Sequence, residues 1–200
     1  GGPALADLTA ILLQWYLPGI GAPRTPASEA LPARIAALYG SLADGEFVLS
    51  LRDFHSENLI WLPERTGHAR LGLLDFQDAV AAHPAYDLVS LLQDARRDVP
   101  LAVEQAMIAR YILSRGLDHD RFAAIYALLG AQRALRIVGV FARLARRDGK
   151  PHYLSLLPRV WAALERNLAH PALAGLASAV HEGLPAPTPG RIAQLTERAG

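Results

Sequence analysis

Cysteine is absent from the 200 residues of this sequence, which excludes disulfide bridges and cysteine-ligated metal centres. Lysine is almost absent as well, since Lys150 is the one lysine among 20 basic residues and the rest are arginine. The formal net charge is only +1. Because neither sign dominates, the charge balance offers no electrostatic argument for a nucleic-acid partner or a membrane-surface partner.

Long apolar runs are also lacking. Residues 8–23 carry no charge, but Gln14, Pro18 and the glycines interrupt them, and the segment is too short to span a bilayer. The first residues, GGPALAD, lack the basic start of a signal peptide. With 52% hydrophobic and 20% charged residues, the composition is that of an ordinary globular domain. We therefore expect a soluble cytoplasmic protein or a piece of one.

Apolar residues recur at helical spacing along most of the chain. The pattern predicts a helix over residues 4–16, ended by Pro18-Gly19, and a second helix that Ser28 caps and that runs to residue 42. Asp118 or Asp120 is the expected cap of a long later helix. Helices are predicted after Asp78 over residues 86–96, 101–115, 121–146, 152–170 and 171–182.

A small β unit stands between these helical regions. Residues 47–51 fit a short buried strand that follows a turn at Asp44-Gly45, and residues 58–62 and 71–76 predict the two strands of a hairpin. We therefore predict a mainly α fold with a small β-hairpin unit. Its expected parts are a hairpin region at about residues 46–78, a helical subdomain at about 84–182, and a linker with a tail helix over 183–200.

Polar side chains gather in the segment LRDFHSENLIWL, residues 51–62. Asp53 and Asn58 stand five residues apart directly after a predicted strand, and Asp75 follows the returning strand of the hairpin. Phosphoryl transfer from a nucleotide needs such a set. One carboxylate orients or deprotonates the acceptor hydroxyl, while an Asn oxygen and an Asp carboxylate hold Mg²⁺ against the phosphates.

The ordered motifs resemble those of a known superfamily. They look like the C-terminal lobe of the aminoglycoside phosphotransferase and choline kinase-like families, which have a protein-kinase-like α+β fold. Most closely they resemble the bacterial anomeric N-acetylmuramate/N-acetylglucosamine kinases of peptidoglycan recycling. The resemblance covers roughly residues 10–170. It is carried by LRDFHSENLIWL (51–62), GLLDFQDAVAAHPAYDLVSLLQDARRDVP (72–100) and AQRALRIVGVFARLARRDGKPHYL (131–154).

The resemblance implies roles for the polar residues of the hairpin. Asp53 would be the catalytic residue, and Asn58 and Asp75 would be metal ligands, with ATP and Mg²⁺ as cofactors. The alternative is that they are an exposed turn Asp, a turn Asn and a strand-end Asp. Asp78 is a weaker candidate for the metal or the substrate, and capping of the next segment is an equal alternative for it.

Three further residues are expected to support the loop rather than to react. Arg52 would pair with a carboxylate near Asp53, and His55 would brace the loop through a hydrogen bond. Asp87 stands near a predicted helix N-terminus, where its carboxylate can accept backbone N–H groups, so a structural role is expected.

Gln132, Arg133 and Arg136 share one face of the long predicted helix. N-acetylmuramate carries a carboxylate, and arginine recognises carboxylates through two parallel hydrogen bonds. The hypothesis is that Arg133 or Arg136 contacts the sugar. The alternative is that the arginines pair with acids such as Asp94 or face solvent.

The sequence also departs from its relatives. Many aminoglycoside kinases have His-Gly before the catalytic Asp, where Leu51-Arg52 stands here, and the metal segment reads Asp-Phe-Gln-Asp from Asp75 rather than Asp-Phe-Gly. Both departures fit the sugar kinases better. No glycine-rich phosphate loop and no lysine precede Asp53, so we expect the nucleotide-covering N-terminal lobe to be absent from this chain and to be its partner in the whole protein.

The sequence thus predicts the C-terminal part of an ATP-dependent phosphotransferase that acts on a sugar hydroxyl. By itself the 200-residue chain is expected to bind ATP weakly and to turn over little. Two alternatives stay open. An aminoglycoside antibiotic phosphotransferase would share the motifs but would be expected to have an acidic cleft, and a non-catalytic kinase-like binding module would not depend on Asp53.

Overall fold

The computed structural model describes residues 1–43 and 47–196. The chain divides into two compact units, Gly1–Ala43 with Ala123–Gly200, and Asp44–Phe122, and each is described here by itself. The predicted turn at Asp44-Gly45 and the last residues of the predicted tail, 197–200, lie outside the described residues. The domain limits expected from the sequence stay a prediction.

The first unit begins with a helix that changes its winding. Helix α1, Gly2–Ile11, continues into a π-helical turn at Leu12–Tyr16 and the short α2, Leu17–Gly19. The helical path therefore ends at the Pro18-Gly19 pair, where the sequence predicted its end. Pro18 directly follows the π-helical turn, and its missing N–H removes one hydrogen bond of the continuing helix.

Helix α3, Pro26–Leu42, begins at a capping box. Thr25 Oγ1 accepts from Ser28 N at 3.1 Å, and Ser28 Oγ accepts from Thr25 N at 2.9 Å. The prediction that Ser28 is the N-cap is wrong, because the helix starts three residues earlier. Pro26 fits there since the first helical position needs no N–H donor.

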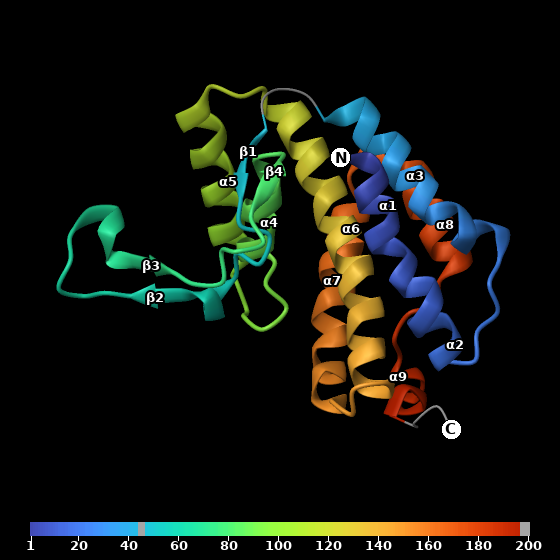
Figure 1. The fold of residues 1–200 in the computed structure, drawn as a ribbon. Helices are drawn as coiled ribbons and strands as arrows, with labels where there is room; N and C mark the ends of the chain where they lie inside the picture. Colours follow the sequence, from blue (N-terminus) through green and yellow to red (C-terminus); the bar gives the residue numbers. More distant parts are fainter. Residues whose placement is uncertain (44–46, 197–200) are drawn as a thin grey trace. The chain divides into compact units, whose positions relative to one another are not determined.

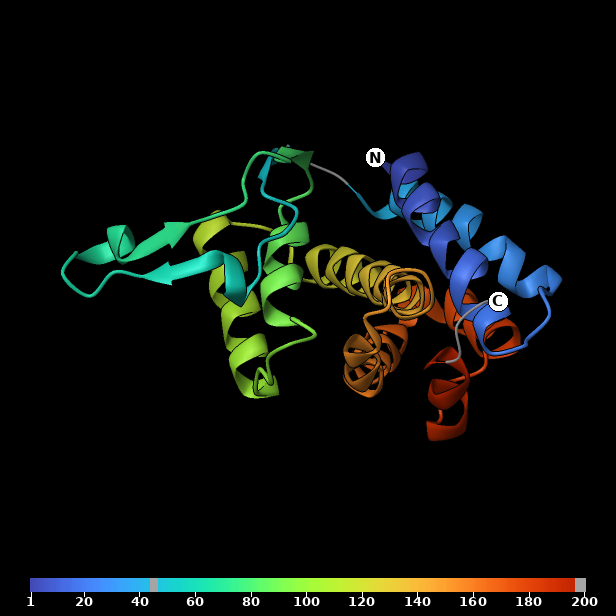
Figure 2. The ribbon, with the colours of Figure 1, turned by 60° about the horizontal axis from the view of Figure 1, so that its bottom comes forward.

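Four more helices belong to this unit: α6, His119–Arg146, from residue 123 onward; α7, Leu157–Leu168; α8, Ala174–Gly183; and α9, Pro189–Thr196. Helix α1 packs on α3 and α3 packs on α8 (Figures 1 and 2). The segments predicted as the starts of helices at residues 152 and 171 are instead 3₁₀ turns, Pro151–Leu156 and Pro171–Leu173. The core consists of fully buried side chains, among them Leu12, Tyr16, Leu31, Ile35, Leu128, Leu135 and Leu164.

Two glycines allow close helix packing in this unit. A Cβ added to Gly139 of α6 would lie 2.5 Å from the backbone nitrogen of Leu12, and one added to Gly183 would lie 2.5 Å from Ser28 N. Real Cβ atoms do not approach backbone so closely. The helices therefore meet here through their main chains, and α6 lies directly against the π-helical turn.

Helix α6 is also the one helix of the described residues that is long and apolar enough to cross a membrane. Its most apolar window is 83% buried. Core helices of globular proteins pass the same test of length and composition, so this match is weak evidence for a membrane span.

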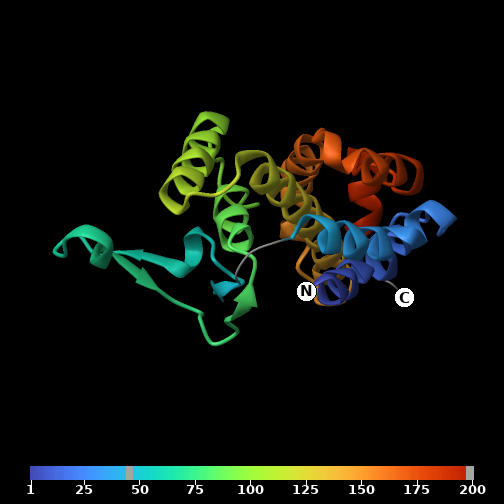
Figure 3. The ribbon, with the colours of Figure 1, turned by 90° about the horizontal axis from the view of Figure 1, so that it is seen from above.

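The second unit contains two small antiparallel sheets. Strand β1, Val48–Ser50, pairs with β4, Val80–Ala82, and β2, Leu59–Trp61, pairs with β3, Leu71–Leu73. The β2–β3 hairpin extends away from β1 and β4, as Figures 1 and 3 show. Strand β4 was not predicted, because the apolar pattern after Asp78 was read as helical.

Two helices complete the second unit, α4, Ala85–Leu92, and α5, Leu101–Arg115. The bounds of α5 match the prediction, whereas α4 ends four residues before the predicted end. Asp118 Oδ1 accepts from Arg121 N at 2.8 Å, so Asp118 caps the start of α6. The resulting mainly α arrangement with a small hairpin unit is the predicted fold class, and the predicted hairpin is confirmed by the pairing of Leu59 with Leu73.

The expected burial of the first strand is not found. Phe47 is 57% exposed and Leu49 is 75% exposed, while only Ser50 of this strand is buried. The strand predicted at residues 47–51 is therefore half-buried, and its side chains alternate between exposed and covered positions. They are not buried on both faces of the sheet.

Candidate active site

The loop that follows β1 has a strained backbone at one of its candidate residues. Arg52 has φ +66° and Asp75 has φ +56°, and they are the two non-glycine residues with positive φ in the described chain. Such backbone conformations cost free energy and persist only where the surroundings hold them. The contacts that hold the Arg52 bend come from α4.

Asp87, in the first turn of α4, binds the end of β1. Its Oδ1 accepts from Ser50 Oγ at 2.7 Å and from Arg52 N at 3.2 Å, and its Oδ2 accepts from Leu51 N at 2.7 Å. Ser90, one turn later, donates from Oγ to the main-chain oxygen of Arg52 at 3.4 Å. Helix α4 thus binds both the main-chain N–H and the main-chain oxygen of Arg52 and holds the bend in place. This supports the structural role expected for Asp87.

A second carboxylate, Asp94, anchors the other end of the loop. It is 2% exposed, and its Oδ2 accepts from Ser56 Oγ at 2.8 Å and from Ser56 N at 3.3 Å. Burial raises the pKa of Asp94, but the N–H of Arg96 and the two Ser56 donors outweigh this, so its pKa lies below the usual range. The Glu57–Arg96 ion pair at 3.0 Å adds a surface contact.

The sequence interpretation missed this anchoring role of Asp94 and considered it only as a partner for arginines. Its spacing from Asp87 was an available signal. The two residues are seven apart, which is two helical turns, so a helix through both would direct the two carboxylates to one side.

Asp53, Asn58 and Asp75 lie together at the base of the hairpin. Asn58 Nδ2 donates to the Asp53 main-chain oxygen at 2.9 Å and lies 3.5 Å from Asp75 Oδ2. Leu74 N donates to the Asn58 main-chain oxygen at 3.0 Å, which extends the β2–β3 ladder to the residue before Asp75. The hairpin register is therefore what brings Asn58 and Asp75 to the same place.

The main chain of Asp53 is hydrogen-bonded within the loop, whereas its carboxylate is not. The main-chain oxygen accepts from Asn58 and from His55 N, and the main-chain nitrogen donates to Leu51 O. The carboxylate itself makes no hydrogen bond or ion pair with the described residues. It is a half-buried acceptor on a loop that is held on both sides, which suits it to bind a substrate hydroxyl.

Comparison with known proteins gives the family. A family model described as the phosphotransferase enzyme family matches residues 2–125, and these include the whole hairpin and its anchors. The chain belongs to this family. The family has a protein-kinase-like fold, and the mainly α structure with short antiparallel strands described above agrees with it.

Curated proteins of the family are also similar to this chain. It is 57% identical over 126 residues, 62% of the chain, to a Caulobacter vibrioides protein named N-acetylmuramate/N-acetylglucosamine kinase. It is 33% identical over 180 residues, 84% of the chain, to a protein of the same name from Pseudomonas putida. The matches span 35% and 51% of these relatives, so the chain covers from about a third to about half of their length.

The other two candidate residues of the loop, His55 and Arg52, have less complete contacts. His55 Nε2 lies 3.4 Å from Asn58 Nδ2, and His55 Nδ1 is buried without a partner among the described residues. Arg52 is held through its main chain, and its side chain forms no ion pair within the described part of the chain, so the predicted pairing with a carboxylate is not seen.

The segment after Asp75 shows one contact that the sequence interpretation did not consider. Gln77 Nε2 donates to Asp75 Oδ1, so the glutamine that replaces the glycine of Asp-Phe-Gly binds the candidate metal ligand. Asp78 is exposed and makes no such contact with the cluster, and its assignment to metal or substrate stays a prediction.

Gln132, Arg133 and Arg136 lie on α6 in the other unit. Gln132 is fully buried, and its Nε2 donates to Leu5 O and Thr9 Oγ1 of α1, both at 3.2 Å. The amide nitrogen of Gln132 thus joins two helices, and the assignment of Gln132 to sugar binding stays a prediction. Arg133 is 7% exposed, while Arg136 is half-buried and lines a cavity.

The cluster has the donor chemistry that Mg²⁺ requires. Because Asn58 Nδ2 is directed to the Asp53 carbonyl, its Oδ1 is on the opposite side of the amide, and Asp75 adds a carboxylate. Among residues 1–43 and 47–196, no three His, Cys, Asp or Glu side chains are placed to hold a metal. A Mg²⁺ bound by Asn58 and Asp75 would therefore share its coordination with phosphate oxygens and water, which is its usual mode in nucleotide sites.

Proposed function

We propose that the protein to which this chain belongs transfers the γ-phosphoryl group of ATP to a hydroxyl of an amino sugar. The candidate sugars are N-acetylmuramate and N-acetylglucosamine, because the similar curated proteins are named for them. The anomeric hydroxyl, a place in cell-wall sugar recycling and a cytoplasmic location are parts of the same proposal. The observation that supports it most is the Asp53 carboxylate, which forms no hydrogen bond or ion pair within residues 1–43 and 47–196. The residue stands next to the Asn58–Asp75 pair, because Asn58 binds the Asp53 main chain.

Asp53 would accept a hydrogen bond from the acceptor hydroxyl and take its proton as the sugar oxygen bonds to the γ-phosphorus and the bond from that phosphorus to the leaving ADP breaks. Asp87 and Asp94 act on this step only through the backbone, since they fix the two ends of the loop that positions Asp53. Asn58 and Asp75 would hold Mg²⁺, which when bound neutralises the charge of the nucleotide phosphates. Most of the rate would come from positioning and charge neutralisation.

We further propose that a preceding lobe of the same protein covers the nucleotide and the apolar faces of the strands. Two findings support this. The relatives are about two to three times as long as their matched regions, by the shares of 51% and 35%. Large apolar side chains of the strands are exposed, among them Phe47, Leu49, Ile60, Trp61, Leu71 and Leu73.

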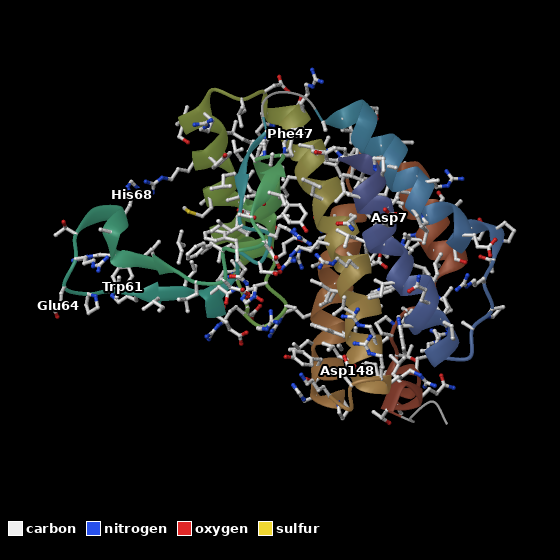
Figure 4. All side chains as sticks on the ribbon, in the orientation of Figure 1. Asp7, Phe47, Trp61, Glu64, His68 and Asp148 are labelled. Carbon is white, nitrogen blue, oxygen red and sulfur yellow. The ribbon has the colours of Figure 1, made fainter. Side chains whose placement is uncertain are left out.

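The proposal is tested by phosphorylation assays on the full-length protein with ATP and a panel of amino sugars. We expect Asp53→Asn to lower kcat by about 10²- to 10⁴-fold, the range for loss of a general base. Glu64→Gln, at the tip of the β2–β3 hairpin (Figure 4), is the control and should leave kcat unchanged. Unchanged turnover in Asp53→Asn would overturn the role of Asp53, and no phosphorylation of any substrate by the wild-type protein would favour a binding module. Turnover of aminoglycosides but not of amino sugars would favour an antibiotic kinase.

A further inference from the structure

The first unit contains a cavity of about 430 Å³ between α1 with its π-helical turn and α6. Its polar lining consists of Asp7 and Gln14 from the first segment and of Arg136, Arg143 and Arg147 from α6 and the residue after it. Trp15 and aliphatic side chains form the apolar part of the wall. The volume lies in the range of small-molecule sites, which typically combine apolar walls with a few polar groups.

The geometry of two helices creates this lining. Arg136 and Arg143 stand seven residues apart, so one face of α6 carries both, and Arg147 follows directly after the helix. The π-helical turn Leu12–Tyr16 contains Trp15, and Gly139 allows α6 to approach the backbone of that turn. Single π-helical turns inside α-helices occur frequently at functional sites.

The arginines are not equivalent. Arg147 is bound by Asp148, labelled in Figure 4, with Nε to Oδ1 at 2.6 Å and Nη2 to Oδ2 at 3.2 Å. Arg143 has a buried Nε that finds no hydrogen-bond partner among the described residues. A buried donor without an acceptor is costly, and a ligand oxygen would satisfy it.

We propose that this cavity binds a sugar that carries a carboxylate. Arg143 would donate to the carboxylate with support from Arg136, because guanidinium groups match carboxylate geometry. The ring of Trp15 would pack against a face of the sugar, and Asp7 on α1 (Figure 4) would accept from its hydroxyls. The site rests on the cavity, whereas the identity of the sugar, N-acetylmuramate rather than neutral N-acetylglucosamine, rests on the proposed function.

The inference is tested by calorimetric titration of the full-length protein without nucleotide, so that no phosphoryl transfer is needed. We expect N-acetylmuramate to bind at least about 10-fold more tightly than N-acetylglucosamine, since the latter lacks the charge-assisted hydrogen bonds. Arg143→Gln should lower the affinity for N-acetylmuramate by about 10- to 100-fold and leave the affinity for N-acetylglucosamine unchanged. The control is Arg159→Gln on α7, because Arg159 is exposed and lies outside the cavity. This replacement should change the affinity for neither of the two sugars.

Circular dichroism verifies the fold of each variant, and Arg136→Gln replaces Arg143→Gln if that variant does not fold. Equal affinity for the acid in wild type and the arginine variants would overturn the inference. So would equal affinity for the two sugars, or binding of inorganic phosphate in place of the acid.

The two proposals fail separately. Sugar binding that depends on Arg143 in a protein without kinase activity would sink the proposed function and keep the site. Kinase activity in a protein whose affinity for N-acetylmuramate in the titration does not depend on Arg143 would keep the function and sink the site.

Discussion

At the scale of single residues, two carboxylates outside the reacting cluster determine the shape of the candidate catalytic loop. Asp87 binds three donors at the end of β1, and Asp94 binds Ser56 and Arg96 at the far end of the loop. Hydrogen bonds to a charged acceptor are stronger than neutral ones. They offset the strain of positive φ at Arg52.

Replacement of Asp87 tests this support. We expect Asp87→Ala to lower the free energy of unfolding by about 2–3 kcal/mol, because the N–H groups of Leu51 and Arg52 lose their acceptor. Urea denaturation of the full-length protein measures the change. Asp98→Ala, an exposed residue of the same unit, should change stability by less than about 0.5 kcal/mol. Equal effects of the two replacements would show that the Asp87 contacts contribute nothing specific.

Asp94 predicts a dependence of stability on pH. Its folded-state pKa lies below the usual value of 3.8, so its contribution is present above the unfolded-state pKa and is lost as pH falls through the folded-state value. We expect Asp94→Asn to be less stable than wild type at about pH 6 and the difference to shrink below about pH 4. Unfolding free energies measured across this range check the prediction. A difference that stays constant with pH would contradict it.

At the scale of elements, backbone proximity explains what periodicity alone missed. The helical pattern predicted one helix over residues 4–16, yet the structure changes to π winding at Leu12, where Gly139 of α6 approaches. Strand β4 was missed for a related reason. Three residues are too few to show a period, and their pairing with β1 is a contact between segments far apart in the sequence.

Two glycines with opposite surroundings test the close packing of α6. We expect Gly139→Ala to lower the free energy of unfolding by about 1–3 kcal/mol, because its Cβ would lie 2.5 Å from Leu12 N. Gly40 of α3 has nothing within 4 Å of an added Cβ, so Gly40→Ala should stabilise by about 0.4–1 kcal/mol. Thermal and urea denaturation compare the pair. Stabilisation by both variants would mean that α6 and the π-helical turn are farther apart than described.

At the scale of the whole molecule, the exposed apolar strands and the length of the relatives lead to the same expectation. The strands β1, β2 and β3 leave large apolar side chains in solvent, and such patches usually mark an interface. The proposed N-terminal lobe is a partner that would cover them. Helix α5 offers a matched comparison, because Leu113 is even more exposed than Leu49.

Whether the N-terminal lobe covers the β1 face is tested in the full-length protein by placing a charge at Leu49 and, for comparison, at Leu113. We expect Leu49→Asp, at a residue 75% exposed in this chain, to lower the free energy of unfolding by about 2–4 kcal/mol because an interface would bury the charge. Leu113→Asp, at 85% exposure, should be nearly neutral. If the two variants are equally neutral, the β1 face is not covered in the whole protein.

The sequence by itself determined the fold class, the hairpin, and the order of the motifs around Asp53, Asn58, Asp75 and Asp87. These depend on local pattern and spacing, which the chain carries in its own order. Only the tertiary structure decided that Asp94 anchors the loop, that Gln132 is buried between helices, and that Arg136 and Arg143 line a cavity with Trp15. Each of these depends on which residues distant in sequence come into contact, and no local period encodes that.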